Sequence, residues 1–519
     1  MVARIFVDKP CCFGGNDFFM QSDSSNKSEI LDTAAESVSE ISDLGSGKKK
    51  NKKKERQPKE AVDMTEGPFL KKMFLFAIPI MLTGFLQSFY NAADLVIVNL
   101  FSDSDAPLVG AIGCTSALTN LVLGMFLGLS IGAGVVAAHY IGAKREKDVS
   151  AVLHTSVLLS VITGVVIAIA GFFLAEPLLV AMGTSEQVLP YAALYLKIIF
   201  LGTPGSLLYN YIASILRSAG DSKSPLIFLA LSGIANVLLN IFFVAVFDMD
   251  VDGVALATII SQYLSAAMGI VYLIRIKGFL HFSFKCLRID RKKLKRLLHI
   301  GIPSGIQTSL FSLSNTLIQA SMNSIDTVAG AGGRIIDGYA ATSNLEGFVY
   351  IAMHSIYSVV LTFVGQNVGA KKYNNIKKLT LYAIFLAVTL GISMGGVMLV
   401  FRNQLLGLYT SGDVAMEAAL TRMYIIMPTY FLCGMMDVLC ATLRSLNRSV
   451  TSMVLSLTFT CGLRIVWINT VFAYFGTGTS LFISYPVSWL VSSLVHLVFI
   501  IVTTKKLLKQ QREEIELNL

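Results

Sequence analysis

The chain has 519 residues, of which 54% are hydrophobic and only 14% are charged, and its mean hydropathy is +0.66. A water-soluble protein of this length would fold as several domains with charged surfaces, so the composition excludes that class and predicts a protein surrounded largely by lipid. The net charge of +9 lies in loops and in one tail, which gives no basis for nucleic acid as a partner.

Residues 1–63 differ in composition from the rest of the chain. They are rich in Ser, Asp, Glu and Lys, and they contain the lysine run KKKNKKK at 48–54. Such a segment buries too little apolar surface to offset the entropy of ordering it, so we expect a disordered basic tail. The start has no apolar core of the length that a signal peptide needs.

From Pro68 onward the sequence alternates long apolar runs with short polar loops. The runs measure roughly 20 to 28 residues, the length of a spanning α-helix, and none shows the ten-residue alternation of a barrel strand. Twelve transmembrane helices are therefore predicted, at 69–99, 108–140, 150–174, 188–218, 225–247, 254–276, 298–324, 338–366, 378–401, 416–445, 452–475 and 480–505.

The two halves of the apolar region resemble each other. FAIPIMLTGFLQSFYN in the first half matches IGIPSGIQTSLFSLSN in the second, and Leu216-Arg217-Ser218 matches Leu443-Arg444-Ser445. The fold class is therefore an all-α membrane protein with two six-helix lobes related by an internal parallel repeat. The expected parts are a tail (1–63), an N-lobe (64–276), a cytoplasmic inter-lobe loop (277–297), a C-lobe (298–506) and a C-terminal tail (507–519).

Positive charge alternates between the predicted loops. The 275–296 loop carries nine Lys and Arg residues, whereas the loops on the other side, such as the one with Asp248, Asp250 and Asp252, are acidic. Basic loops face the cytoplasm, so both termini are predicted to be cytoplasmic in a multi-pass protein of the cell membrane.

Four prolines fall inside predicted helices, and they form two repeat pairs, Pro79 with Pro303 and Pro204 with Pro428. Proline removes a helical hydrogen bond and kinks the helix, which suits two bundles that rock around a shared cavity. The alternative is a fixed kink. The sequence contains no nucleotide-binding, nucleophile–base or metal-ligand pattern, so we expect a secondary transporter driven by an ion gradient, with no cofactor and no catalytic residues.

Charged residues inside predicted helices are costly and are functional by default. The set comprises Asp94, Lys197, Glu346, Asp437 and Arg464, with His354 as a titratable addition. Arg464 lies deep enough to need a partner, and Asp437 or Glu346 is expected to supply it, either in a transport role or as a permanent ion pair. Lys197 either extends its ammonium group to the outer surface or belongs to the site.

The chain resembles the multidrug and toxic compound extrusion (MATE) transporters, in particular the branch common in anaerobic Gram-positive bacteria. The resemblance runs from about Met64 to Lys506 and rests on LFAIPIMLTGFLQSFYNAADLVIV, GLSIGAGVVAAHYIGAKREKDV, LRSAGDSKSP and FVGQNVGAKKYNNIKK. Family chains typically begin near MTEGPFLKK, so Met64 resembles an ordinary family start.

The resemblance implies export of amphipathic, often cationic, small molecules by a monomer in exchange for H⁺ or Na⁺. It implies an N-lobe proton or cation site at Asp94, aided by Asn236, Asn240 and Thr258, where Na⁺ is one candidate ion. Part of the family has a second aspartate where Asn240 stands. Glu346 and Asp437 are the C-lobe coupling candidates. The alternative function is a flippase for a lipid-linked or polysaccharide precursor.

Overall fold

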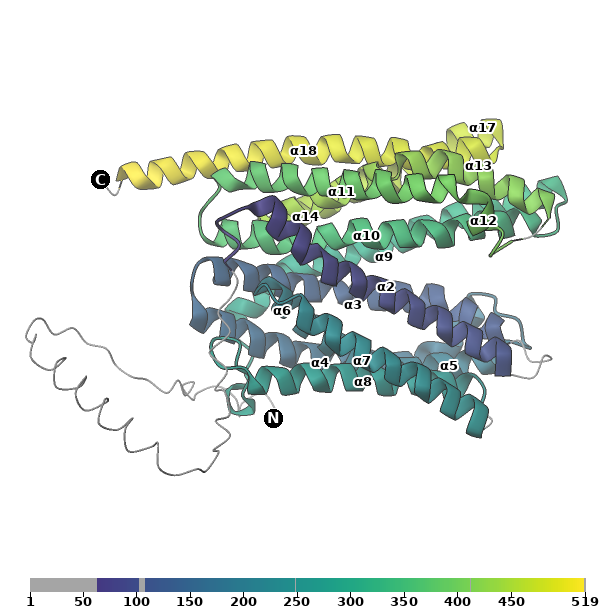
Figure 1. Cartoon of the computed structure of the whole chain (residues 1–519), viewed down its shortest axis with the longest axis horizontal. Helices are drawn as coiled ribbons and strands as arrows, with labels where there is room; N and C mark the ends of the chain where they lie inside the picture. The colour runs from purple at the N-terminus through teal and green to yellow at the C-terminus, as the bar shows by residue number, and fades with distance from the viewer. Residues whose placement is uncertain (1–62, 102–107, 248, 411, 518–519) are drawn as a thin grey trace, which may run out of the picture. The chain divides into compact units, whose positions relative to one another are not determined.

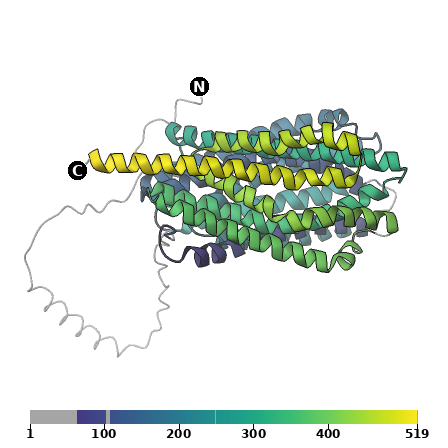
Figure 2. The same cartoon turned by 90° about the horizontal axis from the view of Figure 1, so that it is seen from above.

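The computed structural model describes residues 63–101, 108–247, 249–410 and 412–517. The predicted tail at 1–63 therefore lies outside the described residues, apart from Asp63. The described residues are helical or irregular and contain no strand. In Figures 1 and 2 they form long helices that run side by side, and the C-terminus lies at the end of the longest one.

The first lobe is built from the helices before residue 276. They are α2 (Phe69–Phe101), α3 (Leu108–Gly142), α4 (Glu146–Ala181), α5 (Leu189–Leu201), α6 (Thr203–Ser218), α7 (Lys223–Ile241), the π-helical η3 (Phe242–Val246) and α8 (Val251–Arg275). A connection with one 3₁₀ turn, η4 (Phe284–Cys286), leads to the second lobe.

The second lobe contains the remaining helices. They are α9 (Arg291–Ala329), α10 (Arg334–Gly369), α11 (Asn374–Val400), α12 (Arg402–Leu406), α13 (Asp413–Thr429), α14 (Phe431–Ser445), α15 (Ser449–Ser456), η5 (Leu457–Gly462), α16 (Leu463–Trp467), η6 (Ile468–Phe472), α17 (Ala473–Phe475) and α18 (Gly478–Leu517). Figure 1 shows α9 to α18 grouped beside α2 to α8.

Within the described residues, nine helical segments are long and apolar enough to cross a membrane, and two bent helix pairs raise the number to eleven. The remaining predicted span corresponds to α9, whose 39 residues include many Ser, Gln and Asn side chains. Polar residues in a membrane helix usually face the protein interior or a water-filled cavity; α9 packs against α3 and the helices of its own lobe, and several of its polar side chains line a cavity described below.

The two bends fall at repeat-related prolines. α5 and α6 meet at 46° beside Pro204, and α13 and α14 meet at 47° just after Pro428. Pro79 and Pro303 instead lie inside α2 and α9, which continue through them without a break. The predicted kinks therefore appear as helix breaks at one repeat pair only.

The span predicted at 452–475 is interrupted by two π-helical segments, η5 and η6, which flank the five-residue α16. A π-turn closes i→i+5 hydrogen bonds and is wider than an α-turn, and such turns are frequent at functional sites. Arg464 lies in α16 between them.

The two lobes meet where α3 crosses α9, and glycine residues make this contact possible. Gly128 and Gly132, four residues apart on α3, face Gly305 and Gly301 on α9, and Gly124, one turn earlier, faces Thr308. A Cβ atom on Gly132 would lie 2.8 Å from the Gly301 nitrogen, and one on Gly128 would overlap the Gly305 backbone. Small residues at this spacing let membrane helices touch backbone to backbone.

Hydrogen bonds also join the lobes at the ends of α6 and α10. Gln366 donates to the Ser218 carbonyl at 2.8 Å, and its side-chain oxygen accepts from the Met64 backbone nitrogen at 3.1 Å. Asn367 donates to the Met64 carbonyl at 3.0 Å. The segment before α2 is thereby fixed to the second lobe.

We predict that Gly305→Val separates α3 from α9 and destabilises the protein by about 1–3 kcal/mol, the usual cost of overpacking. Gly396→Val in α11 is the matched control, because nothing lies within 4 Å of a Cβ atom there. Thermal unfolding of the purified protein in detergent should show a fall of several degrees for Gly305→Val and little change for Gly396→Val. Equal effects of the two substitutions would contradict this role of Gly305.

Candidate functional site

Four polar side chains predicted to act together lie on three helices of the first lobe. Asp94 on α2 is buried, with 9% exposure, and its carboxylate accepts a hydrogen bond from the Asn240 amide at 2.5 Å. Asn240 also donates to Asn236 at 3.4 Å, and Asn236 donates to the Thr258 hydroxyl at 3.5 Å. We call these four residues the Asp94 cluster; the structure brings all of them together.

One hydrogen-bond acceptor in the Asp94 cluster has no donor in the part of the chain that the structure describes. The side-chain oxygen of Asn240 is buried and accepts no hydrogen bond among the described residues. The described residues also provide no Lys, Arg or His that forms an ion pair with Asp94. A buried carboxylate without a counter-ion is costly, and carboxylate, amide and hydroxyl oxygens are the ligands that hard cations prefer. A proton or Na⁺ would fit this arrangement.

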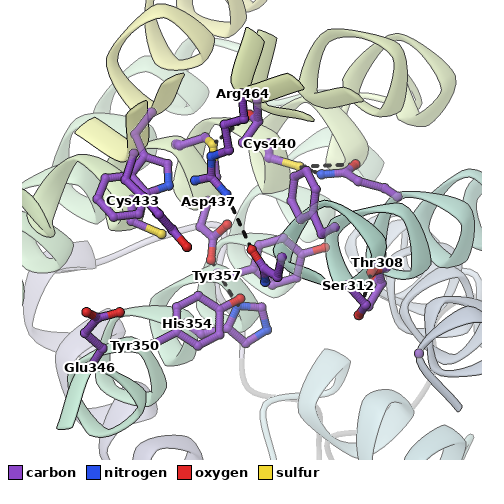
Figure 3. A pocket seen from close by; sticks show the side chains of 18 of the residues that line it. Thr308, Ser312, Glu346, Tyr350, His354, Tyr357, Cys433, Asp437, Cys440 and Arg464 are labelled. Atoms are coloured by element: carbon purple, nitrogen blue, oxygen red, sulfur yellow. Dashed lines mark hydrogen bonds and ion pairs between the residues drawn. The ribbon is translucent and has the colours of Figure 1, made fainter. Parts of the chain in front are cut away.

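A cavity of about 580 Å³ occupies the second lobe and is lined by α9, α10, α13, α14, α16 and α18, with α3 as one wall. Figure 3 shows how its polar side chains converge. Six of the lining residues carry a carboxylate, guanidinium or imidazole group: Glu346, His354, Arg422, Asp437, Arg444 and Arg464. We call this space the C-lobe cavity.

Glu346 and Arg422 form a buried ion pair at the edge of the C-lobe cavity. The guanidinium donates to both carboxylate oxygens, at 2.7 and 2.8 Å, and the two side chains are 6% and 8% exposed. The expected pairing of Arg464 with Glu346 or Asp437 is therefore wrong for Glu346. Helices α10 and α13 pack directly against each other, which brings the Arg422 guanidinium within hydrogen-bonding distance of Glu346.

Asp437 is paired with His354 instead of Arg464. The His354 ring nitrogen Nδ1 lies 3.1 Å from an Asp437 carboxylate oxygen and 3.2 Å from the Tyr350 hydroxyl. The imidazole is stacked between the rings of Tyr350 and Tyr357, at centroid distances of 5.2 and 4.8 Å. Two tyrosine rings on the same face of α10 thus hold the imidazole in place beside the carboxylate.

Arg464 has only neutral partners among the described residues. Its guanidinium donates to Ser488 at 3.1 Å and to Asn315 at 3.5 Å, and it lies 4.2 Å from the Tyr485 ring centroid. In Figure 3 it points into the same space as Asp437, but no ion pair joins them. Helix α16 faces α9 and α18, so the closest side chains to Arg464 are hydroxyl, amide and aromatic groups.

A second cavity of about 420 Å³ lies between the lobes, lined by α2, α3 and α6 on one side and α10 on the other. We call it the central cavity. It shares Tyr350, His354 and Tyr357 with the C-lobe cavity, together with two residues of α3. Arg217, the repeat mate of Arg444, lines it. The two cavities are thus neighbours with a common wall.

Lys197 lies outside both cavities. It bonds Glu176 on α4 at 3.0 Å, and its side chain is 29% exposed. Glu176 was expected in a loop after residue 174, but α4 continues to Ala181, which brings the carboxylate within reach of α5. Lys197 is therefore not a partner of the other intramembrane charges.

Three arginines of the cavities were not singled out from the sequence. Arg217 and Arg444 stand at the ends of the spans predicted at 188–218 and 416–445, and Arg422 lies near the other end of the second of these spans. The sequence could have identified all three as intramembrane charges, because they fall within predicted helices. The packing of α13 and α14 buries Arg422 and Arg444, whereas Arg217 on α6 is half-buried.

Comparison with known proteins places the chain among transporters. The MatE family model matches residues 79–242 and 303–474, one segment in each lobe. The Bacillus subtilis (strain 168) protein named Probable multidrug resistance protein YpnP is 32% identical over 312 residues, which are 60% of this chain and 67% of that protein. The Probable multidrug resistance protein YoeA of the same organism is 28% identical over 394 residues, 75% of this chain and 83% of that protein.

Solved structures share the fold. One, described as the outward-facing conformation of a multidrug resistance MATE family transporter of the MOP superfamily, matches with a TM-score of 0.80 and 19% identity. The match covers 88% of this chain and all of that one.

We predict that Glu346→Gln destabilises the protein strongly, by about 3–5 kcal/mol, because it leaves the Arg422 guanidinium buried without a counter-charge. The double variant Glu346→Gln/Arg422→Met should recover most of that loss, whereas Glu417→Gln on the exposed face of α13 should change little. Thermal unfolding in detergent measures all three. A double variant no more stable than the single one would show that the pair is not the source of the effect.

Proposed function

We propose that this chain, which belongs to the MatE family of transporters, exports amphipathic small molecules across the cell membrane in exchange for H⁺ or Na⁺. The names of the curated relatives YpnP and YoeA support multidrug export. The proposal involves no chemical change to the exported molecule. The basic loops support an orientation with both termini in the cytoplasm.

The observation that carries the ion coupling is the pairing of Asp94 with Asn240. A buried carboxylate receives one amide hydrogen bond, and the adjacent amide oxygen accepts none. Asp94, Asn236, Asn240 and Thr258 would hold Na⁺ through oxygen atoms, or Asp94 alone would take a proton. Either event neutralises a charge that the apolar surroundings disfavour.

Helix α2 connects the Asp94 cluster to the other lobe. Phe85 and Phe89 on α2 lie 6.3 and 6.1 Å from the Phe348 ring on α10, measured between centroids. A Cβ atom on Gly84 would lie 2.5 Å from Ile351 of α10. Cation binding that changes the packing of α2 would therefore act on the central cavity. A ligand shifts such an equilibrium only through different affinities for the two states.

Asp437 is the rival coupling group. Its carboxylate lines the C-lobe cavity and is paired with a histidine whose side chain is 44% exposed. Glu346 is held in a bidentate pair with Arg422, an arrangement that supports a structural role. The transport experiment below separates Asp94 from Asp437.

We predict that dye export by the purified protein in liposomes requires an H⁺ or Na⁺ gradient and Asp94. The substrates are rhodamine 123, a cation, and fluorescein methyl ester, an anion of nearly the same shape, each measured by rapid filtration of the vesicles. Asp94→Asn should lower gradient-driven export of the transported dye about tenfold or more, which corresponds to 1.4 kcal/mol or more of coupling. Asp413→Asn, the same change at an exposed position, should have no effect.

Full gradient-driven export by Asp94→Asn would place the coupling elsewhere, and its loss in Asp437→Asn alone would place it in the second lobe. If neither dye moves under either gradient although the protein is folded, the proposed export function is wrong.

A further inference from the structure

The charges that line the C-lobe cavity do not balance. Three guanidinium groups face two carboxylates, so one positive charge remains when His354 is neutral. Glu346 is neutralised by Arg422 in a bidentate pair, and Asp437 is paired with His354. Arg444 and Arg464 are left without a carboxylate partner among the described residues.

Arg444 is almost completely buried and has a donor to spare. It bonds the Tyr357 hydroxyl and, at 2.6 Å, the Gln307 side-chain oxygen. Its Nε group is buried without a hydrogen-bond partner in the described structure. A guanidinium presents five N–H donors and has no acceptor, so an acceptor is what this group lacks.

Arg464 lies beside a row of aromatic rings. Tyr485 and Trp489 on α18 are 4.2 and 5.8 Å from its guanidinium carbon, and Tyr430 meets the Trp489 ring at 5.3 Å. All of them line the cavity. An arginine over aromatic rings binds planar ligands that carry an anionic group, because the ring stacks while the guanidinium pairs with the charge.

The central cavity repeats this polarity. Arg217 occupies the position in the first lobe that Arg444 occupies in the second, and it lines the central cavity, where none of the lining side chains described is a carboxylate. Two neighbouring cavities therefore each present an arginine from the repeated Leu-Arg-Ser motif.

From these observations we propose that the C-lobe cavity binds the anionic group of a planar amphipathic solute at Arg464 and Arg444, so that the exported compounds include organic anions and zwitterions. The proposal rests on the export function above and narrows its substrate class. An organic cation would meet net positive charge in this cavity and bind less well.

Trp489 gives a direct measure of binding, because the chain has two tryptophans and the other, Trp467, does not line either cavity. In the full-length Trp467→Phe protein, each xanthene dye is titrated against Trp489 fluorescence. We expect fluorescein methyl ester to bind about tenfold more tightly than rhodamine 123. Arg464→Gln should remove that preference by weakening the binding of the anionic dye alone, and Arg464→Lys should keep part of the preference.

Lys197→Gln is the matched control, because it removes one positive charge outside the cavities, and the preference should remain. Tighter binding of rhodamine 123 to the unsubstituted cavity would overturn the proposal. An equal loss of affinity for both dyes in Arg464→Gln would overturn the proposal too, because Arg464 would then only support the cavity wall.

The titration is repeated in nanodiscs of phosphatidylcholine and of phosphatidylglycerol. Equal anion affinity in the two supports a soluble ligand, whereas weaker binding in phosphatidylglycerol would assign the arginines to a lipid headgroup and overturn the soluble-anion proposal. Binding is measured without transport, so the two proposals fail separately. Dye bound but never exported contradicts the export function alone, and export that ignores dye charge contradicts the anion preference alone.

Discussion

Backbone contact between α3 and α9 is the constraint on which the arrangement of the two lobes depends. Gly128 and Gly305 leave no room for a side chain at the crossing, and membrane helices gain little from apolar contact unless they pack this closely. The same helix α3 then serves both cavities. Gly124 and Gly128 line the C-lobe cavity, Gly134 lines the central cavity, and Leu127 and Ile131 line both. A single glycine-rich helix therefore holds the lobes together and divides the space between them.

Polar groups inside the helices fall into two kinds. Some have a partner of opposite charge, as Glu346 has in Arg422, and these pairs stabilise one arrangement of helices. Others are incompletely matched, as are Asp94 with Asn240 in one lobe and Arg444 in the other. Groups of the second kind cost free energy in the apolar interior, and a bound ion or solute would offset that cost. The incompletely matched group is a carboxylate in the first lobe and a guanidinium in the second, at positions that are not repeat mates.

The helical fold could be predicted almost completely from the sequence, because long apolar runs and the internal repeat report directly on membrane spans. The Asp94 cluster could be predicted through the family resemblance, which implies a site at Asp94, and the one-turn spacing of Asn236 and Asn240 on one helix face agrees with it. The partners of Arg464 and Glu346 could not be predicted. They depend on which helices pack together, and α10 packs against α13 while α16 faces α9 and α18. The end of α4 was also missed, because a charged residue such as Glu176 can remain within a helix where Lys197 lies close to it.

The π-helical turns on both sides of α16 indicate where related sequences can lack one residue without a change in the fold. A π-turn holds one residue more than an α-turn, so loss of a single residue from η5 would restore regular winding and leave the flanking segments facing as before. The same loss from α11, which is continuous from Asn374 to Val400, would rotate every later side chain by about 100°. The π-helical η3 can lose one residue in the same way as η5, so related sequences that differ from this one by a single-residue gap in a membrane span are expected to carry that gap within 242–246, 457–462 or 468–472.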